Sequence, residues 1–133
     1  MGLKEDLLNL SLLERLSYVS AENTFYINFE NYQVKGSADV VDIEQTIGNI
    51  LQPLGTKVYA IVNYDNFSIY PEIIDEYTAM VRRLMDTYYT GVTRYTTSTF
   101  LRMKLGDALV KRNVAPHIYE TKEEAQKALK KTD

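Results

Sequence analysis

The hydrophobic pattern near the N-terminus indicates two short strands. Residues 16–20 (LSYVS) and 24–29 (TFYINF) are rich in β-branched and aromatic side chains, and a polar turn of three residues, Ala21-Glu22-Asn23, separates them. Two such runs joined by a short polar turn predict a β-hairpin. Because side chains alternate along a strand, Phe25, Ile27 and Phe29 are expected on one shared face.

The apolar spacing changes after Ser37. Val40, Ile43, Ile47 and Ile50 recur every three or four residues, which predicts an amphipathic helix that ends near residues 53–55, Pro-Leu-Gly. The segment that follows, VYAIVN at residues 58–63, is almost entirely apolar. Such a run is typical of a central strand that is covered on both faces.

Strands and helices then alternate to the end of the chain. Pro71 suits the first turn of a second helix, which we expect to end at Gly91. VTRYT (92–96) predicts a strand, residues 99–110 a helix and HIY (117–119) a last short strand, and Thr121-x-x-Glu124 is a capping box for a final helix through Leu129. The inner face of the second helix would comprise Ile74, Tyr77, Val81, Leu84 and Tyr88.

This order of elements predicts the α/β class, with a mainly parallel sheet and right-handed crossovers. Residues 1–14 are interpreted as a helical lead-in or linker. They are rich in leucine, with Ser11-x-x-Glu14 as a possible capping box, and residues 15–133 are interpreted as one domain. In a parallel sheet the strand ends that lead into helices share one edge, here called the rim, where ligands usually bind.

Composition narrows the classes of function. With 133 residues, 45% of them apolar and 25% charged, the chain suits one globular domain. Its net charge of −3 is well mixed, which argues against a nucleic-acid partner, and its apolar runs are too short for a membrane span. No cysteine and no secretory signal are present, so we expect a cytoplasmic protein without thiolate chemistry. Eleven tyrosines favour a docking face.

The first candidate site is the hydroxyl cluster, Thr96-Thr97-Ser98-Thr99, which begins the helix at 99–110. Hydroxyl side chains cap helix N-termini, and this is the interpretation we favour. Helix N-termini also attract anions, and Arg94 and Arg102 flank the cluster, so the alternative is a site for a phosphate or carboxylate. No glycine-rich phosphate loop is present, which argues against a nucleotide cofactor.

The second candidate lies after the central strand. Asn63, Tyr64, Asp65 and Asn66 could line the edge of a pocket, with Asp65 as a general acid or base. Asn and Asp also form turns by bonding to their own backbone, and we favour a structural turn. His117 is the single histidine in the chain, so neither a metal site nor a proton relay is predicted.

The order of elements resembles the STAS domain, the fold of bacterial anti-sigma-factor antagonists. The ending PHIYETKEEAQKAL is similar to the last strand and helix of that superfamily. The resemblance implies a mixed, mainly parallel sheet with an N-terminal hairpin and helices mostly on one face. The STAS switch is an Asp-Ser motif with a nearby glycine. Here that segment reads YDNFSIYPEI, in which Ser68 is the possible phosphorylation site and the pair and glycine are missing.

A second resemblance covers most of the chain. The blocks VYAIVNYDNFSIYPEIIDEYTAMV, GVTRYTTSTFLRMKLGDAL and APHIYETKEEA, with the leucine-rich start, look like a C-terminal extension of bacterial acyl-CoA:acetate/3-ketoacid CoA-transferases, the family that includes propionate CoA-transferases. The glutamate motif of that family does not occur here, so the resemblance implies an accessory domain without catalytic residues. Its partners would be CoA-transferase catalytic domains, another protein or a second copy. The alternatives are a free-standing partner switch through Ser68, or a small enzyme that uses Asp65.

Overall fold

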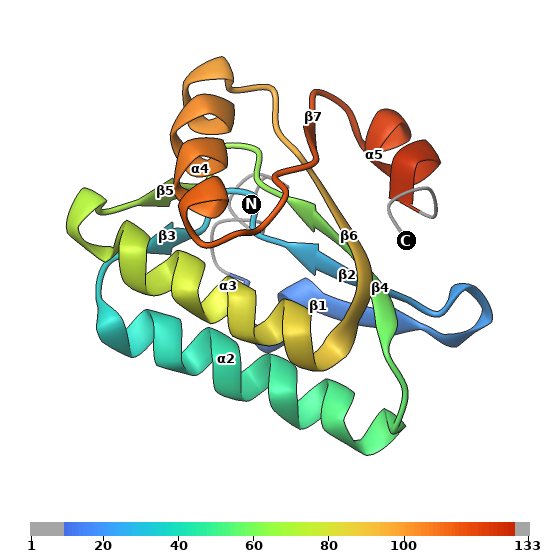
Figure 1. Cartoon of the computed structure of the whole chain (residues 1–133). Helices are drawn as coiled ribbons and strands as arrows, with labels where there is room; N and C mark the ends of the chain where they lie inside the picture. Colours follow the sequence, from blue (N-terminus) through green and yellow to red (C-terminus); the bar gives the residue numbers. More distant parts are fainter. Residues whose placement is uncertain (1–9, 130–133) are drawn as a thin grey trace, which may run out of the picture.

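The fold is a mixed α/β sandwich, seen in a computed structural model that describes residues 10–129 (Figure 1). Its main sheet has five strands in the order β1-β2-β4-β6-β7, and a two-stranded sheet pairs β3 with β5. The strands are β1 Leu16–Val19, β2 Thr24–Asn28, β3 Gln33–Val34, β4 Val58–Asn63, β5 Ser68–Ile69, β6 Tyr89–Tyr95 and β7 Ile118–Tyr119. The helices are α2 Ser37–Leu51, α3 Ile74–Tyr88, α4 Thr99–Lys111 and α5 Lys122–Leu129.

The N-terminal hairpin is confirmed. Strands β1 and β2 pair antiparallel, with Leu16 opposite Ile27 and Val19 opposite Thr24. A 3₁₀ turn over Ser20–Glu22 joins them, and Asn23 closes it with a left-handed φ of 49°. Asparagine tolerates this conformation better than most residues do. The Tyr18 hydroxyl donates to Asn23 Oδ1 at 2.8 Å and holds the turn against the strand.

The remaining strands of the main sheet run parallel, which confirms the predicted fold class. Strand β4 pairs parallel with both β2 and β6, and β6 pairs parallel with β7. Strand β4 is covered on both faces as expected, since Val58, Ala60 and Val62 belong to the main core and Ile61 to a second one. Its nearly continuous apolar sequence therefore matches its central place in the sheet.

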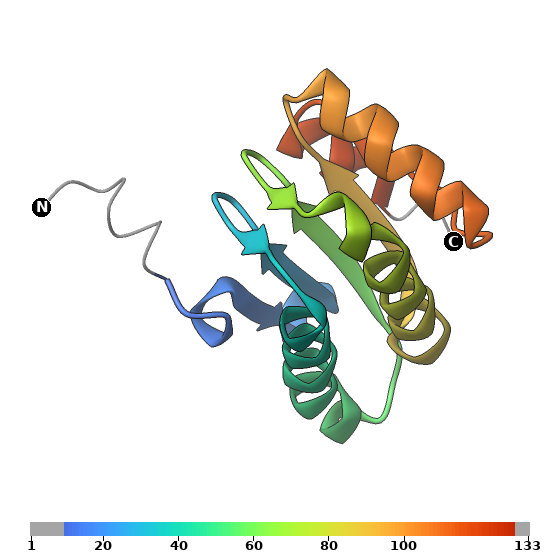
Figure 2. The ribbon, with the colours of Figure 1, turned by 90° about the vertical axis from the view of Figure 1, so that its left-hand side faces the viewer.

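The main core lies between the sheet and the helices α2 and α3, which run side by side (Figure 1). Helix α4 lies alongside α3 and adds Leu105 and Leu109 to this core (Figure 2). Helix α5 packs on the opposite face of the sheet, where Ala125 and Leu129 contact Ile61. Four half-buried tyrosines surround this smaller core: Tyr26, Tyr59, Tyr95 and Tyr119.

Gly91 does not end the second helix as predicted. Helix α3 ends at Tyr88 and β6 begins at the next residue, so Gly91 lies buried inside the strand. Tyr89 pairs with Val58 and Gly91 with Tyr59, which leaves Thr90 as the extra residue of a bulge. Pairing with the start of β4 extends the strand toward the helix, and glycine is common where a strand bulges.

Both predicted capping boxes form. Ser11 N donates to Glu14 Oε1 at 3.0 Å while Glu14 N donates to Ser11 Oγ at 3.2 Å, and Thr121 and Glu124 exchange equivalent bonds. The first box caps only a 3₁₀ turn over Leu13–Arg15, because Leu16 already belongs to β1. The rest of the predicted helical lead-in, residues 1–9, lies outside the described residues.

Two adjacent valines of α2 test how the core stabilises this fold. Val40 is 1% exposed and Val41 is 48% exposed. We expect Val40→Ala to lower the free energy of unfolding by roughly 2 kcal/mol, since it leaves a cavity in the core. Val41→Ala, with the same atoms removed on the same helix, is expected to change it by less than about 0.5 kcal/mol. Urea denaturation followed by circular dichroism measures both, and equal losses would contradict this assignment of the core.

Candidate functional site

The rim brings the two predicted polar segments together. Because β4 and β6 are parallel neighbours, the turn after β4 lies beside the start of α4. Asp65 Oδ1 accepts a 2.7 Å hydrogen bond from Thr97 N and a 3.2 Å bond from Thr97 Oγ1. Asp65 and the hydroxyl cluster therefore lie side by side at the rim, where the Asp65 carboxylate satisfies the N–H of Thr97 just before the start of α4.

The hydroxyl cluster caps α4. Ser98 is the N-cap, and its Oγ accepts a 3.1 Å hydrogen bond from Leu101 N. Thr96 is buried, and its Oγ1 accepts from Ser98 N at 3.2 Å. Thr99 Oγ1 accepts a longer bond, 3.4 Å, from Arg102 Nη2. These contacts satisfy the cap, which is the interpretation that the sequence favoured.

The two arginines do not form a clamp around the cluster. Arg102 Nη1 donates to Thr96 O at 3.3 Å, and its Nη2 lies 3.6 Å from Glu120 Oε1. Arg94 is 1% exposed, and its Nη1 donates at 2.7 Å to Pro116 O on the loop before β7. Arg94 therefore lies in the core and cannot bind an anion at the rim together with Arg102.

Residues 63–66 form a structural turn. Asn63 Oδ1 accepts from Asp65 N at 2.9 Å, an Asx turn, and Asn66 has a left-handed φ of 54°. The Asn66 side-chain amide donates to Asn31 Oδ1, and Asn63 Nδ2 donates to Glu30 Oε1 at 3.1 Å. The turn thus joins the two loops that follow β2 and β4.

Tyr64 does not line the edge of a surface pocket, because it is 2% exposed and belongs to the core. Asp65 has no carboxylate partner for acid–base work in the described contacts. Asp75 is exposed on α3, and Glu76 accepts a 2.7 Å hydrogen bond from Ser37 Oγ on α2. Residues 10–129 contain no group of three or more His, Asp or Glu side chains that could hold a metal ion.

Ser68 and His117 both occupy structural positions. Ser68 is exposed in β5 and its N–H donates to Tyr32 O at 3.0 Å. A 3₁₀ turn over Pro71–Ile73 separates it from α3, so Ser68 does not stand at a helix N-terminus. His117 has a left-handed φ of 41° and precedes β7, and its carbonyl accepts from Arg94 N at 3.0 Å.

Sequence reasoning missed a buried polar group, which we call the tyrosine–arginine cluster: Tyr64, Tyr77, Tyr89 and Arg94. The Tyr64 and Tyr77 hydroxyls lie 2.6 Å apart. Burial raises the pKa of all three tyrosines, and the positive charge of Arg94 opposes that rise. The alternation of side chains along the strand could have indicated that Arg94 is buried, since it places Arg94 on the same face as the core residue Val92.

The predicted tyrosine docking face stays a prediction, since most of the described tyrosines are buried or half-buried. Tyr64, Tyr77 and Tyr89 are buried, and Tyr70, at 42%, is the exposed tyrosine of the described residues. Three of the exposed large apolar residues of the described chain lie on one helix, α4, where Phe100, Met103 and Val110 are 74%, 66% and 59% exposed. We call these three residues the α4 stripe.

Comparisons of the chain with protein-family models, with curated proteins and with solved structures found no match. The family resemblances therefore rest on the sequence blocks alone. In the described part of the chain, the helices are too short or too polar to cross a lipid bilayer.

Substitutions at Ser98 test the capping role. We expect Ser98→Ala to lower the free energy of unfolding by about 1 kcal/mol, since Leu101 N loses its acceptor. Ser98→Asp is expected to retain the stability, because aspartate is an equally good N-cap and its charge suits the helix dipole. Chemical denaturation measures both variants. A loss with Asp as large as that with Ala would show that the hydroxyl does something other than cap.

The pKa of Tyr95 predicts a dependence of stability on alkaline pH. Burial, followed by the nearby charge of Asp65, raises the pKa of Tyr95 to about 12, whereas an unfolded tyrosine titrates near 10. The folded state holds the proton more tightly, so stability is full below pH 10 and is lost as the pH rises toward 12. We expect Tyr95→Phe to reduce this slope in denaturant titrations, and the control Tyr70→Phe, at an exposed position, to leave it unchanged.

Proposed function

We propose that this chain is a non-catalytic accessory domain that docks on the catalytic domains of a CoA-transferase-type protein through the α4 stripe. Of the roles that the sequence resemblance allows, the contacts favour assembly. The polar groups of the rim bond to one another, Asp65 to Thr97 and Ser98 to Leu101. The observation that carries the proposal is the set of three exposed apolar side chains on the outer side of α4, which also carries the exposed Asp107.

The α4 stripe has the properties of a protein interface. Phe100, Met103 and Val110 are three and seven residues apart, so they share one side of the helix, opposite the buried Leu105 and Leu109. Aromatic residues and methionine are enriched at interfaces, and exposed apolar patches commonly mark them. Lys104 lies beside the stripe with Nζ 5.9 Å from the centre of the Phe100 ring, which supplies a charged border.

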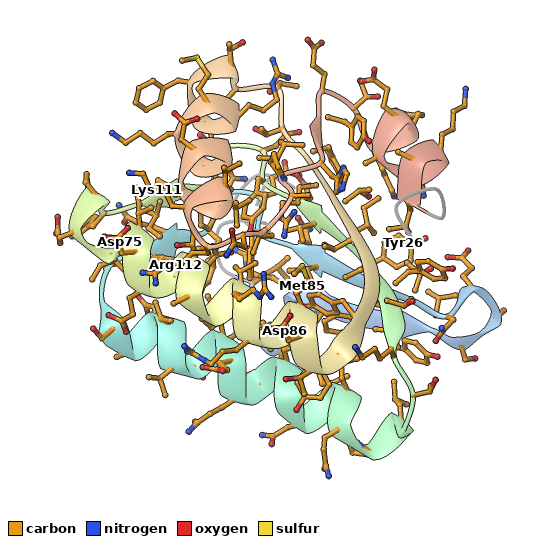
Figure 3. All side chains as sticks on the ribbon, viewed as in Figure 1. Tyr26, Asp75, Met85, Asp86, Lys111 and Arg112 are labelled. Carbon is orange, nitrogen blue, oxygen red and sulfur yellow. The ribbon has the colours of Figure 1, made fainter. Side chains whose placement is uncertain are left out.

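Helix α4 is held firmly enough to present this surface. Its first turn is capped by Ser98, and Arg112 just after its end donates from Nη2 to Asp75 O of α3 at 3.0 Å (Figure 3). A partner would therefore meet a preformed helix face and would not have to order it, which lowers the entropic cost of association. Ser68 lies outside this surface, in β5, and no contact favours a partner switch there.

The experiment combines this chain with a separately produced catalytic core of the propionate CoA-transferase type. We expect binding by analytical ultracentrifugation and titration calorimetry. The double substitution Phe100→Ser and Met103→Ser is expected to weaken it by about tenfold or more, since interface affinity concentrates in a few apolar anchors. Val41→Ser on α2 is the matched control, an exposed apolar residue outside the stripe.

The outcomes separate the two parts of the proposal. Absence of binding between the wild-type chain and the catalytic core overturns the accessory role. Binding that the double variant retains in full shows that the α4 stripe is not the docking face. Circular dichroism of the double variant verifies that α4 stays folded, which is expected because both side chains are exposed.

A further inference from the structure

A small cavity lies in the main core between the sheet and the helices α2 and α3. Its volume is about 20 Å³, and most of its wall is apolar, including Ile27, Ile47 and Leu84. The polar part of the wall is the tyrosine–arginine cluster, with Arg94 from β6, Tyr64 after β4 and Tyr77 from α3. The cavity therefore joins an apolar space to a guanidinium group.

The charge of Arg94 has no counter-ion among the described residues. Its Nη1 donates to the carbonyls of Pro116, at 2.7 Å, and Ala115, at 3.5 Å, both uncharged. Its Nε is buried without a hydrogen-bond partner in this part of the chain, and none of the ion pairs there includes it. A buried charge is strongly unfavourable unless an opposite charge accompanies it.

The cluster holds more hydrogen-bond donors than acceptors. Tyr64 and Tyr77 have two hydroxyl protons between them, and their mutual bond uses one. The guanidinium contributes donors and no acceptor. The three buried hydroxyls stay protonated, because burial raises the pKa of each tyrosine. The Tyr64 hydroxyl oxygen also interacts with Arg94, which opposes the rise in the pKa of Tyr64 that burial causes. One hydroxyl proton of the Tyr64–Tyr77 pair still lacks an acceptor in the described contacts, so the cluster can donate it to an anion beside the guanidinium.

The volume favours a small anion. A cavity needs about 10–15 Å³ to hold one water-sized particle, and this one has about 20 Å³. Phosphate, sulfate and carboxylates carry several heavy atoms, whereas a halide is a single atom only moderately larger than a water molecule, so the small volume favours a halide. A water molecule would satisfy Arg94 Nε and would leave the charge uncompensated.

We propose that the cavity beside Arg94 is a binding site for a single halide ion, chloride under ordinary conditions, held by the guanidinium and a tyrosine hydroxyl. The ion completes the core by neutralising Arg94. It would stabilise the folded state in proportion to its concentration, because the site does not exist in the unfolded chain. The proposal is independent of the docking role of α4, since the α4 stripe does not line the cavity.

The test has a structural arm and a thermodynamic arm. Crystals of the full chain grown in sodium bromide, measured at the bromine absorption edge, are expected to show an anomalous peak within hydrogen-bond distance of Arg94 Nε. In solution, replacing gluconate with chloride at constant ionic strength and pH is expected to raise Tm by about 3 °C or more. Gluconate is the matched anion because it is too large for the cavity.

Two substitutions and a control complete the design. Arg94→Met removes the charge with similar length and is expected to abolish the chloride dependence of Tm. Tyr77→Phe keeps the ring and removes one hydroxyl, so it serves if Arg94→Met does not fold, and it is expected to reduce the dependence. Arg83→Met is the control, because Arg83 is an exposed arginine paired with Glu44. It is expected to keep the full dependence.

A bromide peak at Arg94 together with a chloride effect that Arg94→Met abolishes supports the proposal. A cavity that contains water without an anomalous peak overturns it. A chloride effect of equal size in wild type and Arg94→Met also overturns it, because that effect would be a general action of salt on the surface. The crystallographic arm uses the wild-type chain, so it decides the question even if both variants unfold.

Discussion

The parallel pairing of β4 with β2 and β6 is the constraint on which the rest of the structure depends. It buries β4 on both faces and places the loops after β2, β4 and β6 along one rim. The ladder continues past the end of β4, where Tyr64 N donates to Tyr95 O at 2.9 Å. This bond turns the Tyr64 ring into the core next to Arg94, which pairs with Val62 in the register. The rim contacts and the buried cluster therefore have the same origin.

Strand β6 carries a buried polar residue on each of its two faces, Thr93 on one and Arg94 on the other, and each fixes a neighbouring element in place. Thr93 is fully buried, and its Oγ1 donates to Ala125 O at 2.9 Å, which fixes α5 on one side of the sheet. Arg94 points to the other side and holds the loop between α4 and β7 through Pro116 O. A buried hydroxyl that donates to a carbonyl costs little, while a buried guanidinium without a counter-charge costs much more.

Hydrophobic periodicity predicted most of the fold, because it reports burial directly. The spacing of Val40, Ile43 and Ile47 identified α2, and the apolar run at 58–63 identified β4 with its bounds. It failed where pairing between strands outweighed local preference, as at Gly91, which lies inside a bulged strand. Arginines are seldom buried, so the residue type alone favoured an exposed Arg94, although alternation placed it with the core.

For the candidate site, Asp65 and the capping role of Ser98 were predictable from their positions. The cavity was not, since it depends on packing between three elements. The family resemblances remain predictions.

The two proposed sites meet at the loop 112–117 and yet can be separated. This loop follows α4 and is held from three directions: Arg94 donates to Pro116 O, Arg82 Nη1 donates to Asn113 O at 2.8 Å, and Arg112 donates to Asp75 O. One of these bonds starts from the exposed Arg112, one from the half-buried Arg82 and one from the buried cluster. A change in the charge state around Arg94 would therefore act on the last turn of α4, whereas Phe100 and Met103 stand at its first turns. Phe100 and Met103, the two residues that the docking experiment changes, are thus separated from the cavity by most of the helix, while Val110 is the member of the stripe nearest the loop.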